Sequence, residues 1–263
     1  MGRNAQQDLG DLREWLDLLL ALGWQLAENS NPSDVDHFGS MCWFFLKKAI
    51  EHAHSILTLG ASRDSKLIAR SMLEGMWQLL WAAGKDPEAR ALRWRAFSYV
   101  HDWRELQGQK AAGKPVDVKR VAEIRKGLRK HGDQFLTKKQ RVAKQKGKPL
   151  KTDPYCKNWT GYTAWKIAKE VKGEVTYLEL YRPFSEWQHW GPAGFGNAIA
   201  RRGNQIEYIA TSPEDSATAL AIGFQCLLQM AQVADQHFKM GKSSEIAQLR
   251  NEYIAWYEGR GKA

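Results

Sequence analysis

Two short sets of polar side chains recur at four-residue spacing within otherwise apolar stretches. Arg70 and Glu74 form the first set, and Tyr181, Ser185 and His189 form the second. Residues four apart lie on the same face of an α-helix. A guanidinium, a carboxylate, two hydroxyls and an imidazole could together bind an anion and transfer a proton. We therefore expect these side chains to converge in a solvent-reachable cavity; the alternative is a structural seam of paired polar groups between helices.

A further pair, Arg95 and His101, is separated by five intervening residues in a predicted helix over residues 87–109. An amphipathic helix with both residues on its solvent face explains this spacing without a special function. Together with the two sets above, the candidate catalytic residues are His189, His101, Arg95, Arg70, Glu74, Tyr181 and Ser185.

Basic residues are concentrated in one segment of this 263-residue chain. The chain carries a formal net charge of +10, whereas residues 110–151 contain 15 Lys and Arg and 3 acidic residues, a net charge of +12. The remainder therefore has a net charge of −2. Such a block attracts polyanions, nucleic acid above all, or forms a solvated and partly mobile face. The candidate nucleic-acid-binding residues are Lys119, Arg120, Arg125, Lys126, Arg129, Lys130, Lys138, Lys139 and Arg141.

The sequence lacks the motifs of several common catalytic sites. It contains no HExxH, GxxxxGK[ST] or GxSxG pattern, which disfavours a zinc protease, a P-loop nucleotidase and a serine hydrolase. Glu51 and His54 share a helix face, but an ordinary pair of histidine and carboxylate explains this spacing. Cys42, Cys156 and Cys226 are widely spaced and indicate neither a disulfide framework nor a cysteine-based zinc site. We expect no metal and no cofactor.

Apolar residues recur with helical periodicity along most of the chain. Ser33 or Asp34 is expected to cap the second helix, and Gly203-Asn204 is expected to form the turn of a short hairpin within residues 197–209. The predicted fold is all-α, a bundle of about eight helices with a basic helical or loop insertion. Residues 141–149 are expected to form an exposed loop or a frayed helix. The predicted helices span residues 8–28, 34–59, 62–83, 87–109, 118–128, 162–171, 175–190, 213–240 and 243–257.

We expect a single helical domain over residues 1–263, with the basic segment 110–152 as a partly mobile insertion within it. Apolar residues make up 43% of the chain, which suffices for a folded core. No run approaches the roughly 18 apolar residues of a membrane-spanning helix, and the first residues are too polar for a secretory signal. These features predict a soluble cytoplasmic protein that does not bind membranes and whose apolar helices are available to form a homodimer.

The spacing of these motifs resembles the bacterial all-helical domain-of-unknown-function family 5677. The similar features are an Arg-x-x-x-Glu on an early apolar helix, here Arg70 to Glu74, and a Tyr-x-x-x-Ser-x-x-x-His stretch followed by a Gly/Pro turn at Gly191–Gly196 and a long helix. The preceding segment, Tyr162-Thr-Ala-Trp-Lys-Ile-Ala-Lys-Glu170, is also similar. The resemblance covers roughly Val35 to His237 and implies a helical fold with a polar cluster, but no established reaction. Pro183 and the rich basic segment depart from the family pattern.

A second, weaker resemblance is to the HEPN superfamily of helical ribonucleases and nucleic-acid-associated proteins. Their hallmark is an arginine followed after four to six residues by a histidine, and Arg95 and His101 satisfy this spacing. Ala96 departs from the pattern, because a polar residue often follows the arginine in that superfamily. The resemblance implies metal-independent cleavage of RNA. In that reaction His101 would act as general acid or base when a ribose 2′-hydroxyl attacks a phosphate, and Arg95 would stabilise the charge that develops.

These observations favour a protein that binds or acts on nucleic acid, in the form of a metal-independent ribonuclease or an effector of a defence or toxin system. Whether it is an enzyme is left open by the sequence. One alternative is a non-catalytic helical binding or scaffold protein. Another is an enzyme acting on a small phosphorylated ligand, with His189 as acid or base and Arg70 as the partner of the anion.

Overall fold

The computed structural model describes residues 5–30, 36–189 and 198–260. The chain folds into two compact units, which are described separately. Unit 1 comprises residues 1–84 and 164–263, and unit 2 comprises residues 85–163. The basic segment 110–152 lies within unit 2, which extends beyond it on both sides.

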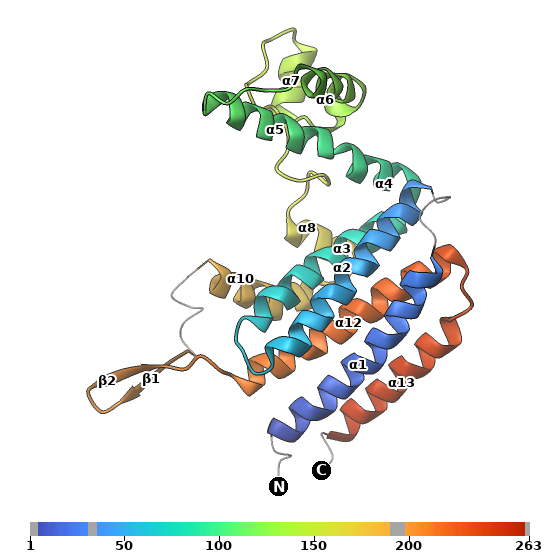
Figure 1. Ribbon diagram of the computed structural model, residues 1–263, viewed down its shortest axis with the longest axis vertical. Helices are drawn as coiled ribbons and strands as arrows, with labels where there is room; N and C mark the ends of the chain where they lie inside the picture. The colour runs from blue at the N-terminus through green and yellow to red at the C-terminus, as the bar shows by residue number, and fades with distance from the viewer. Residues whose placement is uncertain (1–4, 31–35, 190–197, 261–263) are drawn as a thin grey trace. The chain divides into compact units, whose positions relative to one another are not determined.

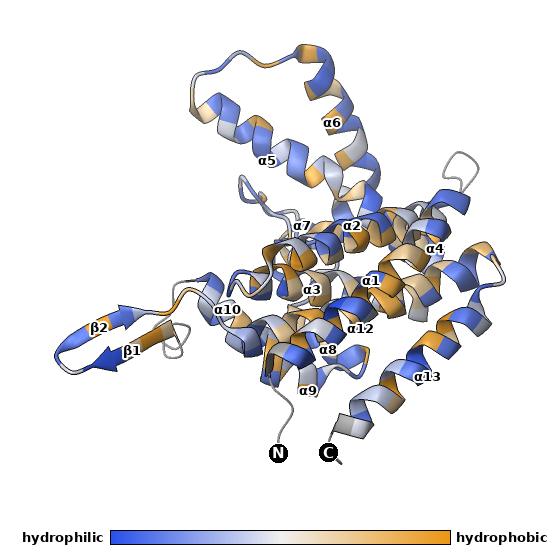
Figure 2. Cartoon of the chain, turned by 60° about the horizontal axis from the view of Figure 1, so that its bottom comes forward, coloured by the Kyte–Doolittle hydropathy of each residue, from blue (hydrophilic) through white to orange (hydrophobic). Residues whose placement is uncertain are grey.

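Unit 1 is a bundle of long helices around one central helix (Figure 1). The central helix is α12, Pro213–Phe238, and it packs most extensively against α1, α2 and α3. Leu16, Ile50, Leu79 and Phe224 are fully buried in the resulting core. In Figure 2, hydrophobic residues are abundant on α1, α3 and α12. The other long helices of this unit are α1, Ala5–Asn29, α2, His37–Leu59, α3, Ser65–Gly84, and α13, Ser243–Arg260.

The central position of α12 explains its composition. By length and apolar content this helix could cross a membrane, although no uninterrupted apolar run marks it in the sequence. Of its most apolar stretch, 61% is buried inside the unit. A helix that is apolar around most of its circumference is the expected core of a helical bundle.

Short polar motifs and glycines begin and end these helices. Ser212 caps α12 by accepting a hydrogen bond from the backbone N–H of Asp215 at 3.2 Å. Gly60 ends α2 with a φ of 61°, a conformation that favours glycine. The N-cap of α2 is Asp36, whose carboxylate accepts from the N–H of Gly39 at 2.6 Å. The N-cap is therefore Asp36 and not the expected Ser33 or Asp34, which lie outside the described residues.

The predicted hairpin is confirmed. Strands β1, Ile199–Arg202, and β2, Gln205–Tyr208, pair antiparallel with Arg202 opposite Gln205. The two residues between them are Gly203 and Asn204, and Gly203 has a φ of 62°. A two-residue hairpin turn needs positive φ, which glycine adopts without strain.

The stretch predicted as one helix over residues 175–190 is instead divided. It consists of α9, Glu174–Thr176, a π-helical turn η3, Tyr177–Tyr181, and α10, Arg182–Gln188. In the π turn the N–H of Arg182 bonds to the carbonyl of Tyr177, five residues earlier. Pro183 follows directly in the first turn of α10, where its missing N–H costs least. The predicted Gly191–Gly196 turn lies outside the described residues. A short helix, α8, Ala164–Glu170, precedes α9 in the chain.

Unit 2 contains shorter helices, and α5 and α6 carry mostly hydrophilic residues (Figure 2). The prediction of one helix over residues 87–109 is wrong, because the chain breaks at Phe97. This residue is buried and its ring contacts Phe135 at 5.1 Å between centroids. The prediction of a loop or frayed helix from residue 141 is wrong in part, because Thr137 caps a helix that continues to residue 145. The helices are α4, Pro87–Ala96, α5, Ser98–Ala111, α6, Val118–His131, the 3₁₀ turn η2, Gly132–Phe135, and α7, Lys138–Gln145.

Two arginines hold the irregular C-terminal part of unit 2 in place. Arg93 Nε donates to the carbonyl of Trp159 at 2.6 Å. Arg104 Nη2 donates to the carbonyl of Cys156 at 2.9 Å, and its Nε donates to Asp153 at 2.9 Å. Both arginines therefore satisfy backbone or carboxylate acceptors of a segment that has little regular structure of its own.

Helices α5 and α6 approach closely because of one glycine. A Cβ at Gly127 would overlap the ring of Tyr99, whereas a Cβ at Gly108 on α5 would meet nothing within 4 Å. We expect Gly127→Ala to destabilise unit 2 by about 1–3 kcal/mol through overpacking. Gly108→Ala is the matched control, and it should be neutral or stabilise α5 by up to about 1 kcal/mol. Hydrogen–deuterium exchange of peptides covering residues 98–131 measures both effects, and equal protection in the two variants would contradict the prediction.

Candidate functional site

Four of the predicted site residues meet between α3 and α10 in unit 1. Arg70 Nη2 donates to the hydroxyl of Tyr181 at 2.7 Å, and Arg70 Nε donates to the hydroxyl of Ser185 at 2.8 Å. Arg70 also pairs with Glu74 at 3.3 Å, and the hydroxyl of Tyr181 donates to the same Glu74 oxygen. The guanidinium thus joins two helices whose residues lie more than 100 positions apart in the chain.

Local structure places each of these side chains. Arg70 and Glu74 lie one turn apart on α3, as the sequence predicts. Tyr181 ends the π turn and Ser185 lies one turn later on α10. The ring of Tyr181 packs against Trp77 at 5.4 Å between centroids, so the aromatic ring is anchored while its hydroxyl reaches the ion pair. The π turn therefore ends at the residue that contacts both Trp77 and the Arg70–Glu74 pair. Such turns frequently occur at functional sites.

Burial, charges and hydrogen bonds in this cluster determine which groups carry protons. Burial raises the pKa of Tyr181 above its usual value, and the hydrogen bond and charge of Glu74 raise it further, against the opposing effect of Arg70. The phenol therefore stays protonated and serves as a donor. Ser185 donates to the carbonyl of Tyr181 at 2.9 Å, so its proton is committed to the backbone rather than to a general base. In this arrangement the cluster positions helices and presents Glu74, whose side chain is 36% exposed, at its edge.

His189 is placed differently from its four predicted partners. Helix α10 ends at Gln188, and His189 forms the C-cap with its backbone N–H bonded to the carbonyl of Ser185 at 3.0 Å. Its side chain is exposed. Among the residues that the structure describes, the imidazole makes no contact with Arg70, Glu74 or Tyr181. Of the predicted row of Tyr181, Ser185 and His189, only the first two belong to the cluster.

A second charged group lies at the start of α3 and was not predicted from the sequence. Arg63 and Lys66 are both buried and share the carboxylate of Asp215, at 2.5 Å and 3.0 Å. The ammonium of Lys66 also lies 4.9 Å from the ring centroid of Trp187 on α10. Such buried cations are retained only when paired with a carboxylate or an aromatic face.

One sequence signal could have found part of this second group. Lys66, Arg70 and Glu74 follow one another at four-residue spacing, so all three share one face of α3. Asp215 carried no such signal, because it belongs to the first turn of α12 and meets Lys66 only in the folded chain. Together the two groups attach both α10 and α12 to the same face of α3.

A histidine on α2 contributes to the pH dependence of unit 1. His52 Nε2 lies 3.2 Å from the hydroxyl of Ser71 on α3. Burial lowers the pKa of His52 below 6.5, and the charge of Lys48 lowers it further, against a smaller opposing effect of Glu51. The unfolded chain therefore binds more protons between the two pKa values, and stability is lost as the pH falls through about 6.5.

We expect His52→Gln to weaken this loss of stability, because glutamine keeps a hydrogen-bonding group but cannot be protonated. His54→Gln, an exposed site two residues along α2, is the control and should leave the wild-type pH dependence unchanged. Urea denaturation at pH 7.5 and pH 5.5 measures the difference. His131 in unit 2 also has a pKa lowered by burial and by the charge of Lys130, so its contribution is present equally in wild type and in both variants. A pH dependence identical in His52→Gln and wild type would show that this histidine is not the cause.

All nine candidate nucleic-acid-binding residues are exposed on α6 and α7 of unit 2. Arg120 pairs with Glu105 at 2.8 Å and with Asp102 at 3.6 Å. The other eight have no acidic partner among the residues that the structure describes. We call these nine residues the basic surface.

Five of the basic residues of α6 share one side of the helix, and Arg120 lies apart from them. With 100° between successive residues, Lys119, Lys126 and Lys130 fall within about 40° of one another, and Arg125 and Arg129 adjoin them. The opposite side holds the buried Ile124. α6 therefore buries its apolar side within unit 2 and turns its cations to solvent.

Arg95 and His101 also belong to unit 2 but lie on different helices. Arg95 is in the last turn of α4, and His101 is in the first turn of α5, beyond the break at Phe97. Both side chains are exposed, and the ring of His101 contacts Phe97 edge-on at 4.9 Å. No described contact joins the guanidinium to the imidazole.

Potential ligands for metals do not cluster in the described residues, where no three His, Cys, Asp or Glu side chains come together. The three cysteines are free. Burial raises the pKa of Cys42 to about 12 and that of Cys226 further still, so both thiols stay protonated. These two cysteines behave as small apolar residues of the core.

Comparison with known proteins places these features in a family. No curated protein and no solved structure matches the chain. A family model matches residues 40–206, a narrower range than the resemblance predicted. The matched region contains the Arg70 cluster and all of unit 2, but not Asp215 or α13. The chain belongs to the family described as "Family of unknown function (DUF5677)".

Proposed function

We propose that this protein binds nucleic acid through the basic surface of unit 2. The observation that carries the proposal is the group of eight exposed cations on α6 and α7 that have no acidic partner among the described residues. Unit 2 holds 21 Lys and Arg and 8 Asp and Glu, a net charge of +13, against −3 for the rest of the chain. Unpaired cations at this density bind phosphate polymers by releasing counterions.

The composition of the basic surface favours contact with phosphates rather than bases. Neither α6 nor α7 contains Phe, Tyr or Trp, the residues on which unpaired bases stack. Lysine and arginine contacts to phosphate fix position but carry no sequence information. We therefore expect binding with little dependence on base sequence.

A salt titration of the full chain tests the proposal directly. Labelled RNA and DNA of random sequence, each single-stranded and double-stranded, are titrated by fluorescence anisotropy between 50 and 300 mM NaCl. We expect the logarithm of the association constant to fall linearly with the logarithm of the salt concentration, with a slope of about −4 to −8 for duplexes. No binding at 50 mM NaCl, or binding that does not change with salt, would refute the proposal.

A catalytic extension of this proposal follows from the location of His101 and Arg95. Both are exposed in the same unit as the basic surface, and their spacing resembles that of the HEPN ribonucleases. We expect the purified protein to cleave RNA in EDTA, and His101→Ala to lower the rate by about 100-fold or more. His131→Ala, in the same unit, is the control. Intact RNA where a control ribonuclease cleaves would remove the catalytic claim and leave the binding proposal standing.

A further inference from the structure

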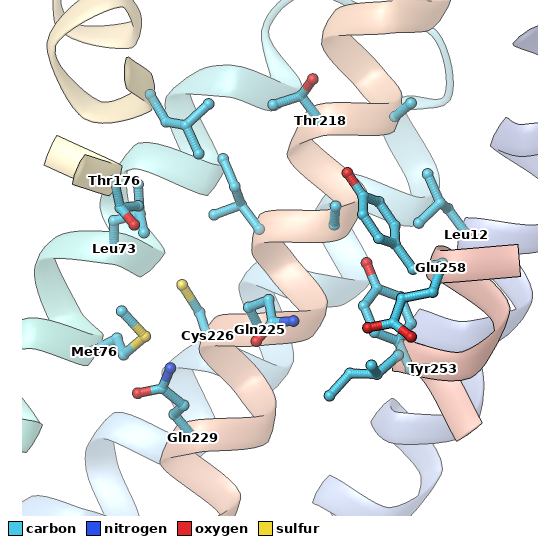
Figure 3. Close-up of a pocket in the computed structure, with 16 residues that line it drawn as sticks. Leu12, Leu73, Met76, Thr176, Thr218, Gln225, Cys226, Gln229, Tyr253 and Glu258 are labelled. Atoms are coloured by element: carbon cyan, nitrogen blue, oxygen red, sulfur yellow. The ribbon is translucent and has the colours of Figure 1, made fainter. Parts of the chain in front are cut away.

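A groove runs along one side of α12 in unit 1, far in sequence from the basic surface. Its floor is formed by α12, and its sides are formed by α3, α9 and η3 on one hand and by α13 on the other (Figure 3). The cavity measures about 650 Å³. Along α12 it extends from Ala217 to Gln229, which corresponds to about 18 Å of helix. It is thus long and narrow.

Small and polar side chains on α12 create this space. Ala217 and Ala221 lie one turn apart and leave room that larger residues would fill. Figure 3 shows Gln225, Cys226 and Gln229 along α12, with Met76 of α3 beside them. The groove therefore combines an apolar floor with two side-chain amides, the composition typical of small-molecule sites.

The groove has a negative charge at one edge. Sixteen described residues line it, and the single charged one among them is Glu258 on α13. Glu258 is exposed, and α13 is held beside the groove by Tyr253, which stacks on Phe224 of α12 at 4.0 Å. A carboxylate without a lining cation disfavours anions, so the groove does not suit the phosphorylated ligand considered from the sequence.

We propose that this groove binds an elongated amphipathic small molecule with an apolar body and a cationic head group. The apolar body lies over Ala221 and Ile254, and the head group faces Glu258. The light-scattering experiment below tests whether a helix of a second copy occupies the groove instead. The site is independent of the proposed nucleic-acid binding, because it lies wholly in unit 1.

Calorimetry with matched probes tests this inference on the full chain. The probes are n-decyltrimethylammonium, n-decanoate and tetramethylammonium, all below micellar concentrations. We expect the long-chain cation to bind, decanoate to bind at least about fivefold more weakly, and tetramethylammonium not to bind. Equal affinity for the two long-chain probes, or no binding of either, would overturn the proposal.

Variants of the groove locate the binding site. Ala221→Trp should fill the groove and abolish binding of the cation, whereas Gln248→Trp, on an exposed part of α13 outside the groove, should not. Thr218→Trp replaces Ala221→Trp if the latter fails to fold. Glu258→Gln should lower the affinity for the long-chain cation by up to about fivefold without lowering the affinity for decanoate. Glu252→Gln is the control. Unchanged binding in the filled variants would place the probes elsewhere.

Light scattering of the same proteins distinguishes a groove that binds a small molecule from one that binds a second copy of the chain. We expect wild type and Ala221→Trp to have the same molar mass. A wild-type dimer that Ala221→Trp converts to a monomer would show that the groove is an interface between copies, and would overturn the proposal.

Discussion

Reversing the charge of Lys126, Arg129 and Lys130 should weaken nucleic-acid binding on the order of 100-fold at low salt. These three residues are exposed in the last turns of α6, and no described acidic residue neutralises them. Each lost phosphate contact should also reduce the magnitude of the salt slope by about one. Anisotropy titrations of the Glu variant and the wild type, each at several salt concentrations, measure both quantities.

The control for this experiment changes the net charge by the same amount, but at positions outside the basic surface. Replacing Lys48, Lys169 and Arg250 by Glu removes the same six units of charge from exposed positions of unit 1. If binding depends on the local surface, this control should retain most of the affinity and the wild-type slope. Equal losses in the two triple variants would mean that net charge alone, rather than the basic surface, attracts the polyanion.

Replacing Arg70 by Ala should destabilise unit 1 by about 2–3 kcal/mol. The side chain of Arg70 is 14% exposed and holds Glu74, Tyr181 and Ser185 together. Its removal leaves two hydroxyls without their donor and Glu74 without its ion-pair partner. Arg70→Lys should recover only part of the loss, since an ammonium cannot form the same fork of hydrogen bonds.

Chemical denaturation followed by tryptophan fluorescence measures this effect. Arg182→Ala on α10 is the matched control, because Arg182 is exposed, and it should change stability by less than about 0.5 kcal/mol. A double-mutant cycle of Arg70→Ala with Tyr181→Phe should give a coupling energy of about 0.5–3 kcal/mol. Additive effects in that cycle would contradict the direct contact between the two residues.

These two predictions assign different tasks to the two units. The Arg70 cluster lies in the family-matched region and connects α3 to α10, which is a structural task in the arrangement described. Eight of the nine residues of the basic surface have no acidic partner among the described residues, so these cations are available to a ligand. A phenotype lost on charge reversal but retained in a folded Tyr181→Phe variant would separate the two tasks.

Features that depend on neighbours in the sequence were predictable from it. The helical character of the chain, the Ser212 cap and the Gly203-Asn204 turn each follow from interactions among residues within five positions. The same holds for the Arg70–Glu74 pair and for the basic side of α6, since helix geometry alone decides which residues share a face. Local rules suffice for such features.

Features that depend on distant residues were decided by the tertiary structure. The break at Phe97 has no glycine or proline to signal it, and it coincides with the burial of the Phe97 ring against Phe135, a contact between residues distant in the sequence. The contacts of Arg70 with Tyr181 and Ser185 span 111 and 115 positions, and Lys66 meets Asp215 across a similar interval. Periodicity states which face a residue occupies but not which helix it faces. That choice follows from how the helices bury their apolar sides around α12, and only the folded chain determines it.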